Sequence, residues 1–177
     1  GYNYFFYPVN FNQKKPFEIS CNIKHTSGID DYAYGLIWGG TKPLTFHNFS
    51  ITANGHFMTF RRENDSYIEE TGWLQSYAID TGNASNLIVI EGDGTNLTYY
   101  INGTQVHKTT IPKRYGEDLG FYVENTQSIE VDYIEVKATL EKINVANGFN
   151  DVKLNMLAKE INTKYDEVFP VVSSDGT

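Results

Sequence analysis

Hydrophobic and polar side chains alternate with a period of two through most of the first 138 residues, which predicts β-strands rather than helices. The pattern is clearest where two alternating segments, 95–101 and 104–109, are joined by Asn102-Gly103. This pair predicts a hairpin with a tight two-residue turn, because both residues accept the positive φ that such a turn needs. The expected cross-strand pairs are Ile101 with Thr104 and Tyr99 with Val106, and the apolar face carries Leu97, Tyr99, Ile101 and Val106.

The segments 45–53 and 56–62 show the same pattern around Asn54-Gly55. A two-residue turn at this place predicts an apolar face that pairs Phe49 with Phe60 and Ile51 with Met58. The opposite, polar face would pair Asn48 with Arg61, Ser50 with Thr59 and Thr52 with Phe57. Amide, hydroxyl and guanidinium groups on one sheet face could hydrogen-bond a sugar, although any solvated sheet face has a similar composition.

Further strands are expected near residues 2–7, 17–24, 32–39, 66–70, 86–91, 118–124 and 128–138. Such a series of short strands is typical of an all-β fold, a two-sheet antiparallel sandwich or jelly roll. The alternation stops after residue 138, so residues 1–138 are interpreted as one domain and residues 139–177 as a linker and the beginning of a following module. The core is expected to contain Phe49, Ile51, Leu97, Tyr99, Ile101, Val106, Phe121 and Val131.

Composition and charge narrow the possible functions. The chain of 177 residues is long enough to bury one sizeable core, and its net charge of -8 disfavours nucleic acid and anionic membranes as partners. No stretch approaches the roughly 20 apolar residues of a membrane span. The single cysteine, Cys21, cannot form a disulfide within the chain, and its alternation with Ile19 and Ile23 predicts a core position.

An ordered series of motifs runs through residues 2–138: Tyr34-Gly35-Leu36-Ile37-Trp38-Gly39, Asn54-Gly55, Trp73, Ala78-Ile79 with Gly82 and Asn86-Leu87, Tyr100-Ile101-Asn102-Gly103, Gly120-Phe121-Tyr122-Val123 and Val131-Asp132-Tyr133-Ile134. This series resembles concanavalin A-like lectin/glucanase domains, and among them the laminin-G-like jelly rolls of secreted bacterial proteins. The resemblance implies a jelly-roll fold and an extracellular, periplasmic or cell-envelope location. It does not fix an activity, because this superfamily includes lectins, carbohydrate-binding modules, glycosidases and adhesion domains.

The last residues carry a second resemblance. The segment 160–177, which contains Phe169-Pro170-Val171-Val172 and ends in Ser173-Ser174-Asp175-Gly176-Thr177, is similar to the opening of the first blade in TolB-like β-propellers. The resemblance implies a following β-propeller module in the same chain as a partner of the domain, within an exported, envelope-associated protein.

A catalytic alternative rests on Glu130-Val131-Asp132-Tyr133-Ile134-Glu135, which matches the Glu-x-Asp-x-x-Glu pattern of laminarinase-type glucanases. In those enzymes two carboxylates about 5 Å apart serve as nucleophile and acid/base in retaining hydrolysis. The other interpretation is that residues 128–138 form the closing strand of the domain. We favour the closing strand, because the glucanase motif lies on a central strand with much of the sheet still to follow.

The candidate ligand-binding residues are Tyr34, Trp38, Asn48 and Arg61, which would stack on and hydrogen-bond a glycan or other cell-surface polymer. Alternation puts Tyr34 and Trp38 on the same side of their strand, so at least one of these rings could belong to the core instead. The acidic residues Asp30, Asp31, Asp80, Asp93 and Asp118 could hold Ca²⁺ only if their loops converge, and no specific motif supports this or any other cofactor. The four histidines show no zinc-ligand spacing.

Three functions are compatible with these features. The favoured one is a non-catalytic carbohydrate-binding or surface-interaction module of a larger exported protein. The second is a glycoside hydrolase that uses Glu130, Asp132 and Glu135. The third is a structural spacer that packs on a following β-propeller. Exposure of Trp38, Tyr34 and Trp73 would favour the first function over the third.

Overall fold

The computed structural model describes residues 1–9, 11–41, 44–64 and 66–138. The regular secondary structure of these residues consists of β-strands. The expected linker and propeller segment, residues 139–177, lies outside the described residues. The strands are β1 (Tyr2–Pro8), β2 (Phe17–Ser27), β3 (Tyr34–Thr41), β4 (Thr45–Ile51), β5 (His56–Glu63), β6 (Ser66–Glu69), β7 (Leu74–Gln75), β8 (Ser85–Gly92), β9 (Asn96–Ile101), β10 (Thr104–Thr110), β11 (Asp118–Glu124) and β12 (Ser128–Ala138).

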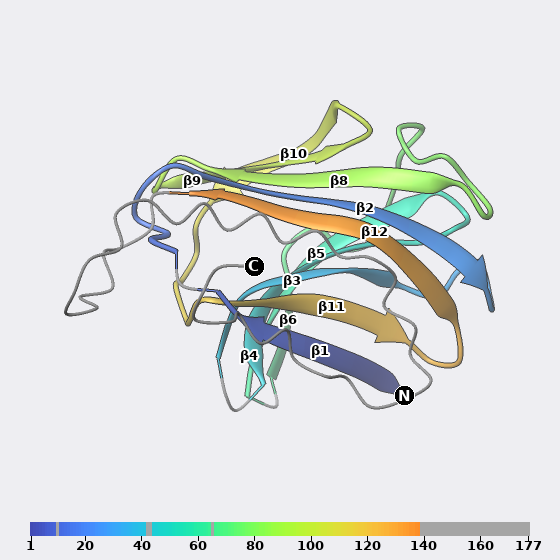
Figure 1. The fold of residues 1–177 in the computed structure, drawn as a ribbon, viewed down its shortest axis with the longest axis horizontal. Helices are drawn as coiled ribbons and strands as arrows, with labels where there is room; N and C mark the ends of the chain where they lie inside the picture. Colours follow the sequence, from blue (N-terminus) through green and yellow to red (C-terminus); the bar gives the residue numbers. More distant parts are fainter. Residues whose placement is uncertain (10, 42–43, 65, 139–177) are drawn as a thin grey trace, which may run out of the picture.

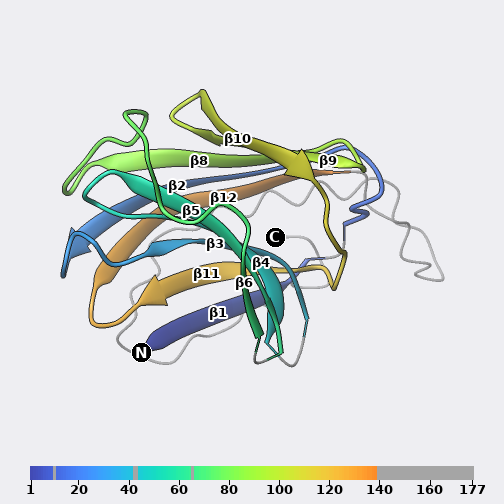
Figure 2. The same cartoon turned by 180° about the vertical axis from the view of Figure 1, so that it is seen from behind.

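The strands form two antiparallel sheets that pack face to face (Figures 1 and 2). The large sheet has the order β1-β11-β3-β4-β5-β6, and the short strand β7 also pairs with β5. The small sheet has the order β10-β9-β8-β2-β12. The predicted all-β, two-sheet antiparallel sandwich is therefore confirmed.

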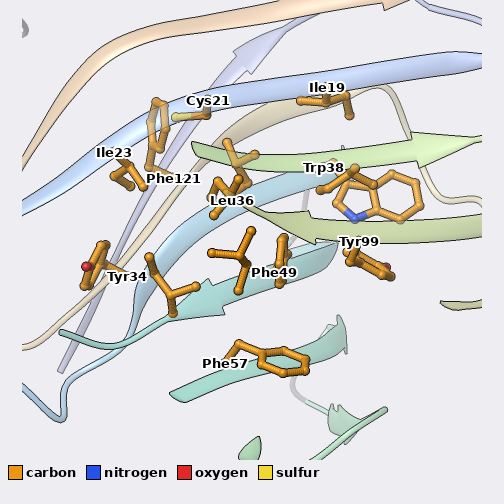
Figure 3. Packing of buried hydrophobic residues seen from close by; sticks show 14 of the residues in the cluster. Ile19, Cys21, Ile23, Tyr34, Leu36, Trp38, Phe49, Phe57, Tyr99 and Phe121 are labelled. Atoms are coloured by element: carbon orange, nitrogen blue, oxygen red, sulfur yellow. The ribbon is translucent and has the colours of Figure 1, made fainter. Parts of the chain in front are cut away.

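The core lies between the sheets and is built from alternate residues of strands in both sheets, as Figure 3 shows for its central part. Cys21 is fully buried there, as its alternation with isoleucines predicts. Six of the eight predicted core residues are buried: Phe49, Ile51, Leu97, Tyr99, Ile101 and Phe121. The other two, Val106 and Val131, are half-buried and pack against the same cluster.

The hairpin at Asn102-Gly103 has the predicted two-residue turn, with φ of 48° at Asn102 and 79° at Gly103. Ile101 lies opposite Thr104 as expected. A β-bulge between Gln105 and His107 then shifts the register, so that His107 and not Val106 lies opposite Tyr99. The extra residue in β10 explains why Val106 is only partly buried.

Replacing Gly103 by valine is expected to lower the free energy of unfolding by more than about 1 kcal/mol. A β-branched residue resists positive φ, and no atom near Gly103 would clash with the new side chain, so the cost arises from the backbone alone. Urea denaturation of the variant measures this loss. An unchanged midpoint would contradict the turn geometry.

The hairpin at Asn54-Gly55 differs from the prediction by one residue. Its loop has three residues, since the Thr52 N–H donates to the His56 carbonyl (2.9 Å) and Gly55 takes positive φ (95°). The Asn54 side chain stabilises this longer loop, because its Oδ1 accepts a hydrogen bond from the Thr52 hydroxyl (2.6 Å). The observed pairs are His47 with Arg61, Phe49 with Thr59 and Ile51 with Phe57.

The extra loop residue exchanges the faces of β5 relative to β4. A shift of one residue moves every side chain of a strand to the other face of the sheet. Phe60 and Met58 therefore lie on the outer face of the large sheet, whereas Thr59 and Arg61 face the small sheet. The predicted polar face, which paired Asn48 with Arg61, does not exist.

Candidate functional site

The four predicted ligand-binding residues do not converge in the structure. Tyr34 and Trp38 are fully buried between the sheets (Figure 3), so neither ring is available to stack on a ligand. Asn48 is buried on the opposite face of the large sheet, where its Nδ2 donates to the Leu36 carbonyl (3.2 Å). Only Arg61 reaches the edge of the sandwich.

Arg61 is held in two ion pairs at that edge. Its Nη1 lies 3.2 Å from a carboxylate oxygen of Glu70, and its Nε lies 3.4 Å from Glu63. Glu63 is the last residue of β5, and Glu70 directly follows β6. Arg61 therefore links these segments, and neither of the predicted rings, Tyr34 and Trp38, is exposed to complete the predicted site with it.

The outer face of the large sheet is strongly curved. Arg62 in β5 donates a hydrogen bond to the Tyr4 hydroxyl in β1 (2.8 Å), although three strands separate β1 from β5. In a flat sheet these two strands would be about 19 Å apart, at roughly 4.8 Å for each strand spacing. The two side chains can meet over this face only because the sheet curls toward it, which makes the outer face concave.

Glycines permit this curvature. Gly35 in β3 and Gly120 in β11 alternate with inward-facing residues and so turn toward the concave face. A Cβ atom on Gly35 would lie 2.1 Å from the Phe49 carbonyl oxygen, and one on Gly120 would lie 1.6 Å from that of Phe5. Only residues without a Cβ can occupy positions where neighbouring backbones approach so closely.

Aromatic rings fill the floor of the concave face. The buried residues of this second hydrophobic cluster are Ala33, Ile37, Phe46, Met58, Phe60 and Tyr122. Tyr4 packs over them, with its ring centroid 5.4 Å from Phe46 and 5.7 Å from Tyr122. The face is therefore an aromatic surface supported by its own small core.

Two further tyrosines border this floor and are open to solvent. Tyr2 is 57% exposed and stacks on Tyr122 at 5.6 Å, and Tyr67 is 51% exposed and lies 4.7 Å from the Phe60 ring. We call Tyr2, Tyr4, Tyr67 and Tyr122, together with Arg62, the tyrosine face. The tyrosine face extends over the concave side of the large sheet from one edge strand, β1, to the other, β6.

Tyr67 and Tyr4 of this face carry neutral hydroxyl groups. Burial raises the pKa of Tyr67 to about 12, and the carboxylate of Glu69 acts in the same direction. Burial likewise raises the pKa of Tyr4, which the Arg62 guanidinium partly offsets. Neutral phenols both donate and accept hydrogen bonds, and their rings offer apolar faces. This combination suits a ligand with hydroxyl groups and exposed C–H bonds.

One sequence signal could have indicated this face. Tyr2, Tyr4 and Phe6 alternate in the first strand, so three aromatic rings share one side of it. The one-residue error at Asn54-Gly55 assigned Phe60 to the apolar face with Phe49 and Ile51. The alternation of hydrophobic and polar residues does not predict the sheet curvature that brings Arg62 to Tyr4.

The carboxylates of the catalytic alternative lie on an edge strand. Glu130 and Glu135 belong to β12 at the edge of the small sheet, and Asp132 is the extra residue of a β-bulge between Val131 and Tyr133. The Glu130 side chain is 71% exposed beside Lys24, and Glu135 pairs with Lys137 at 3.3 Å. Neither glutamate has the enclosed setting that glycosidases use to tune a general acid.

Three of the candidate calcium ligands, Asp93, Asp80 and Asp30, lie against other side chains or N–H groups of the chain. The Asn96 side chain and backbone N–H groups of Asn96 and Thr95 hold the pKa of Asp93 at about 2. Asp80 accepts a hydrogen bond from Asn102 (3.3 Å), and Asp30 lies 3.8 Å from His25. Among the described residues, no group of three or more His, Cys, Asp or Glu side chains is placed to hold a metal ion.

A second exposed aromatic region lies near β7. Trp73 is 43% exposed, Leu74 is 44% exposed and Tyr77 is almost entirely in solvent. Exposure of Trp38, Tyr34 and Trp73 was expected to favour ligand binding over a spacer role. Of these three rings, only Trp73 is accessible to solvent. Within the part of the chain that the structure describes, no helix is long and apolar enough to cross a membrane.

Several solved structures share this fold. The carbohydrate-binding module CBM66 from Bacillus subtilis matches with a TM-score of 0.62 and 14% identity, over 78% of this chain and 83% of its own. Sheep galectin-11 matches with a TM-score of 0.58 and 12% identity, over 76% and 98% of the two chains. The carbohydrate recognition domain of Emp47p matches with a TM-score of 0.59 and 10% identity, over 78% and 79%.

These similarities define the class of fold, a concanavalin A-like jelly roll. At such low identities they concern the fold alone. No known family profile matches the sequence, and no curated protein sequence matches it either.

Proposed function

We propose that this domain is a non-catalytic carbohydrate-binding module that binds glycan chains through the tyrosine face. The observation that carries the proposal is the concave, aromatic surface on which Tyr2 and Tyr67 are exposed on either side of the Tyr4–Arg62 hydrogen bond. Sugars bind proteins by stacking their C–H faces on aromatic rings while their hydroxyl groups bond to polar side chains. The tyrosine face offers both kinds of contact.

The comparisons support this proposal. The three structures described above are, by name, a carbohydrate-binding module, a galectin and a carbohydrate recognition domain. The net charge of -8 favours neutral glycans over acidic ones, because like charges repel. The exposed, lysine-paired carboxylates of β12 give no support to the hydrolase alternative.

The proposed setting of the module is a larger exported protein at the cell surface or in the cell envelope. Its partners would be a glycan or cell-surface polymer and a following β-propeller module in the same chain. The motifs in residues 2–138 and 160–177 support this setting through their resemblance to modules of such proteins.

A glycan-array screen of the full chain tests the function, and a variant of an exposed ring tests the site. Once a binding glycan is found, Tyr67→Ala is expected to weaken its binding roughly tenfold, about 1.4 kcal/mol, through loss of a stacking ring. Calorimetric titration measures this change.

The control is Tyr77→Ala, which removes a tyrosine that is 97% exposed, follows β7 and is not part of the tyrosine face. This variant should bind the glycan as the wild type does. Loss of binding in Tyr77→Ala with normal binding in Tyr67→Ala would move the site to the region of β7. Absence of binding to any neutral glycan would refute the proposed function.

A further inference from the structure

Trp73 is exposed at the edge of the large sheet, immediately before the short strand β7. Its exposed fraction is 43%, and that of its neighbour Leu74 is 44%, so solvent reaches both side chains almost equally. The two residues nevertheless occupy different faces of the sheet. The pairing of β7 with β5 shows which face belongs to each of them.

This pairing puts Trp73 on the concave side of the large sheet. Leu74 lies opposite Phe57, and Phe57 belongs to the core between the sheets. Directly paired residues of antiparallel strands share a face, so Leu74 lies on the side of the small sheet. Successive residues of an extended chain point to opposite faces, so Trp73 lies on the same side as the tyrosine face.

The segment that connects β6 to β7 keeps this assignment of faces. Four residues of the segment, 70–73, lie opposite two residues of β5, 58–59. The excess is taken up by a bulge, where the Thr59 carbonyl accepts hydrogen bonds from the N–H groups of Glu70 (3.0 Å) and Thr71 (3.3 Å). Because the side-chain period of a strand is two, an excess of two residues leaves the faces in step.

Met58 connects Trp73 to the tyrosine face. The Tyr67 ring lies 4.7 Å from Phe60, and its hydroxyl donates a hydrogen bond to the Met58 Sδ (3.2 Å). The Tyr67 side chain therefore extends along the edge of the sheet toward β7. Continuing the pairing of Phe57 with Leu74 by one position brings Met58 to Trp73. The apolar surface thus runs from Tyr67 over Met58 to Trp73.

We propose that Trp73 is a further ligand-binding residue of the tyrosine face and that the ligand is an extended oligosaccharide chain. This inference rests on the proposed function, because it requires that the tyrosine face binds glycans. An exposed indole offers a large apolar surface on which the C–H face of a sugar stacks. Trp73 would hold one part of the chain while the tyrosines and Arg62 hold another.

The length of this surface excludes a single sugar as the complete ligand. Arg62, which bonds to Tyr4, and Met58, which lies beside Trp73, are four residues apart in β5. At a rise of roughly 3.4 Å per residue this separation is about 14 Å. One sugar ring is too short to contact both ends, whereas a chain of several sugars spans them.

Tryptophan fluorescence reports the contact, because the chain has only two tryptophans and Trp38 is fully buried. The probes are the linear neutral oligosaccharides of the glycan array, used as sets of one linkage from the monosaccharide to the hexasaccharide. Each set that binds is titrated into the full wild-type chain. We expect a higher affinity for the longer members, and a saturable shift of the emission to shorter wavelength with those members only.

Two results of this titration would overturn the inference while the proposed function stands. One is binding that does not depend on chain length, including binding of single sugars or of branched glycans alone. The other is an emission spectrum that stays unchanged when a long oligosaccharide binds. Absence of binding to every glycan of the array is a different outcome, because it refutes the proposed function and this inference together.

Trp73→Ala and Leu74→Ala form a matched pair of variants, since the two residues are adjacent and equally exposed but lie on opposite faces. Trp73→Ala should weaken the binding of long members roughly tenfold and leave the binding of short members unchanged. The emission of its remaining Trp38 should not respond to glycans. Leu74→Ala should bind all members as the wild type does. Equal losses in both variants, or no loss in Trp73→Ala, would contradict the assignment of Trp73 to the concave face.

Discussion

Replacing Gly35 by alanine is expected to lower the free energy of unfolding by about 3 kcal/mol. The added Cβ would lie 2.1 Å from the Phe49 carbonyl oxygen and 2.6 Å from the Ser50 Cα. These are backbone atoms of the paired strand β4, so no side-chain rotation can relieve the clash. The sheet would have to uncurl or the β3–β4 pairing would have to open.

Urea denaturation of Gly35→Ala measures this cost, and Gly82→Ala is the comparison. Gly82 has positive φ (71°) with no atom within 4 Å of its Cβ position, so its substitution carries only backbone strain, about 1 kcal/mol. If both variants lose the same stability, the approach of β3 and β4 at Gly35 is not what limits substitution there.

The fold could be predicted because its evidence is local. The Asn102-Gly103 turn depends on two adjacent residues whose backbone preferences are known, and it fixes the pairing of Ile101 with Thr104. Alternation then identifies which side chains of β9 point inward, and Leu97, Tyr99 and Ile101 are all fully buried. Neither step needs information from distant parts of the chain.

The register at Asn54-Gly55 could not be read from those two residues alone. The same dipeptide serves a two-residue loop in one hairpin and a three-residue loop in the other. The difference is set by contacts of neighbouring side chains and of a distant segment: the Asn54 N–H donates to the Asp30 carbonyl (2.9 Å), and Asn54 Oδ1 accepts from Thr52. Long-range contacts of this kind leave no trace in a hydrophobic pattern.

The candidate site was missed for a related reason. Its parts come from both edges of the large sheet, and they meet only because the sheet curls. Gly35 and Gly120 are visible in the sequence, but glycine in a strand has several meanings, such as a bulge, a bend or a close approach. Which meaning applies depends on the strand that lies beside it.

The burial of Tyr34 and Trp38 follows from the same alternation that identified the core. Both rings share a side of β3 with Leu36, and that side faces the small sheet. Large aromatic residues in a central strand are more often core than binding surface. The exposed rings of the tyrosine face, Tyr2 and Tyr67, belong instead to the edge strands β1 and β6.

Acidification from pH 7 to pH 4.5 is expected to lower the free energy of unfolding by about 2 kcal/mol through His47 alone. Burial between the sheets, together with the Arg61 guanidinium, lowers the pKa of His47 to about 4, although the Lys113 carbonyl and Glu63 act in the opposite direction. In the unfolded chain the pKa of a histidine is about 6.5. The unfolded state therefore binds the proton first.

The sign follows from this order. Above pH 6.5 both states keep His47 neutral and stability is complete, and it is lost progressively as the pH falls toward 4. The Asp93 carboxylate, whose pKa is about 2, loses its contribution mainly below this window. His107, whose pKa burial also lowers, adds a loss of the same sign in the wild type and in any His47 variant.

His47→Gln isolates the contribution of this one side chain. Glutamine keeps a donor that can reach the Lys113 carbonyl but has no group that titrates in this range. Urea denaturation at pH 7 and at pH 4.5 should show a loss in the wild type that exceeds the loss in the variant by about 2 kcal/mol. Equal losses would mean that His47 already carries its proton in the folded protein.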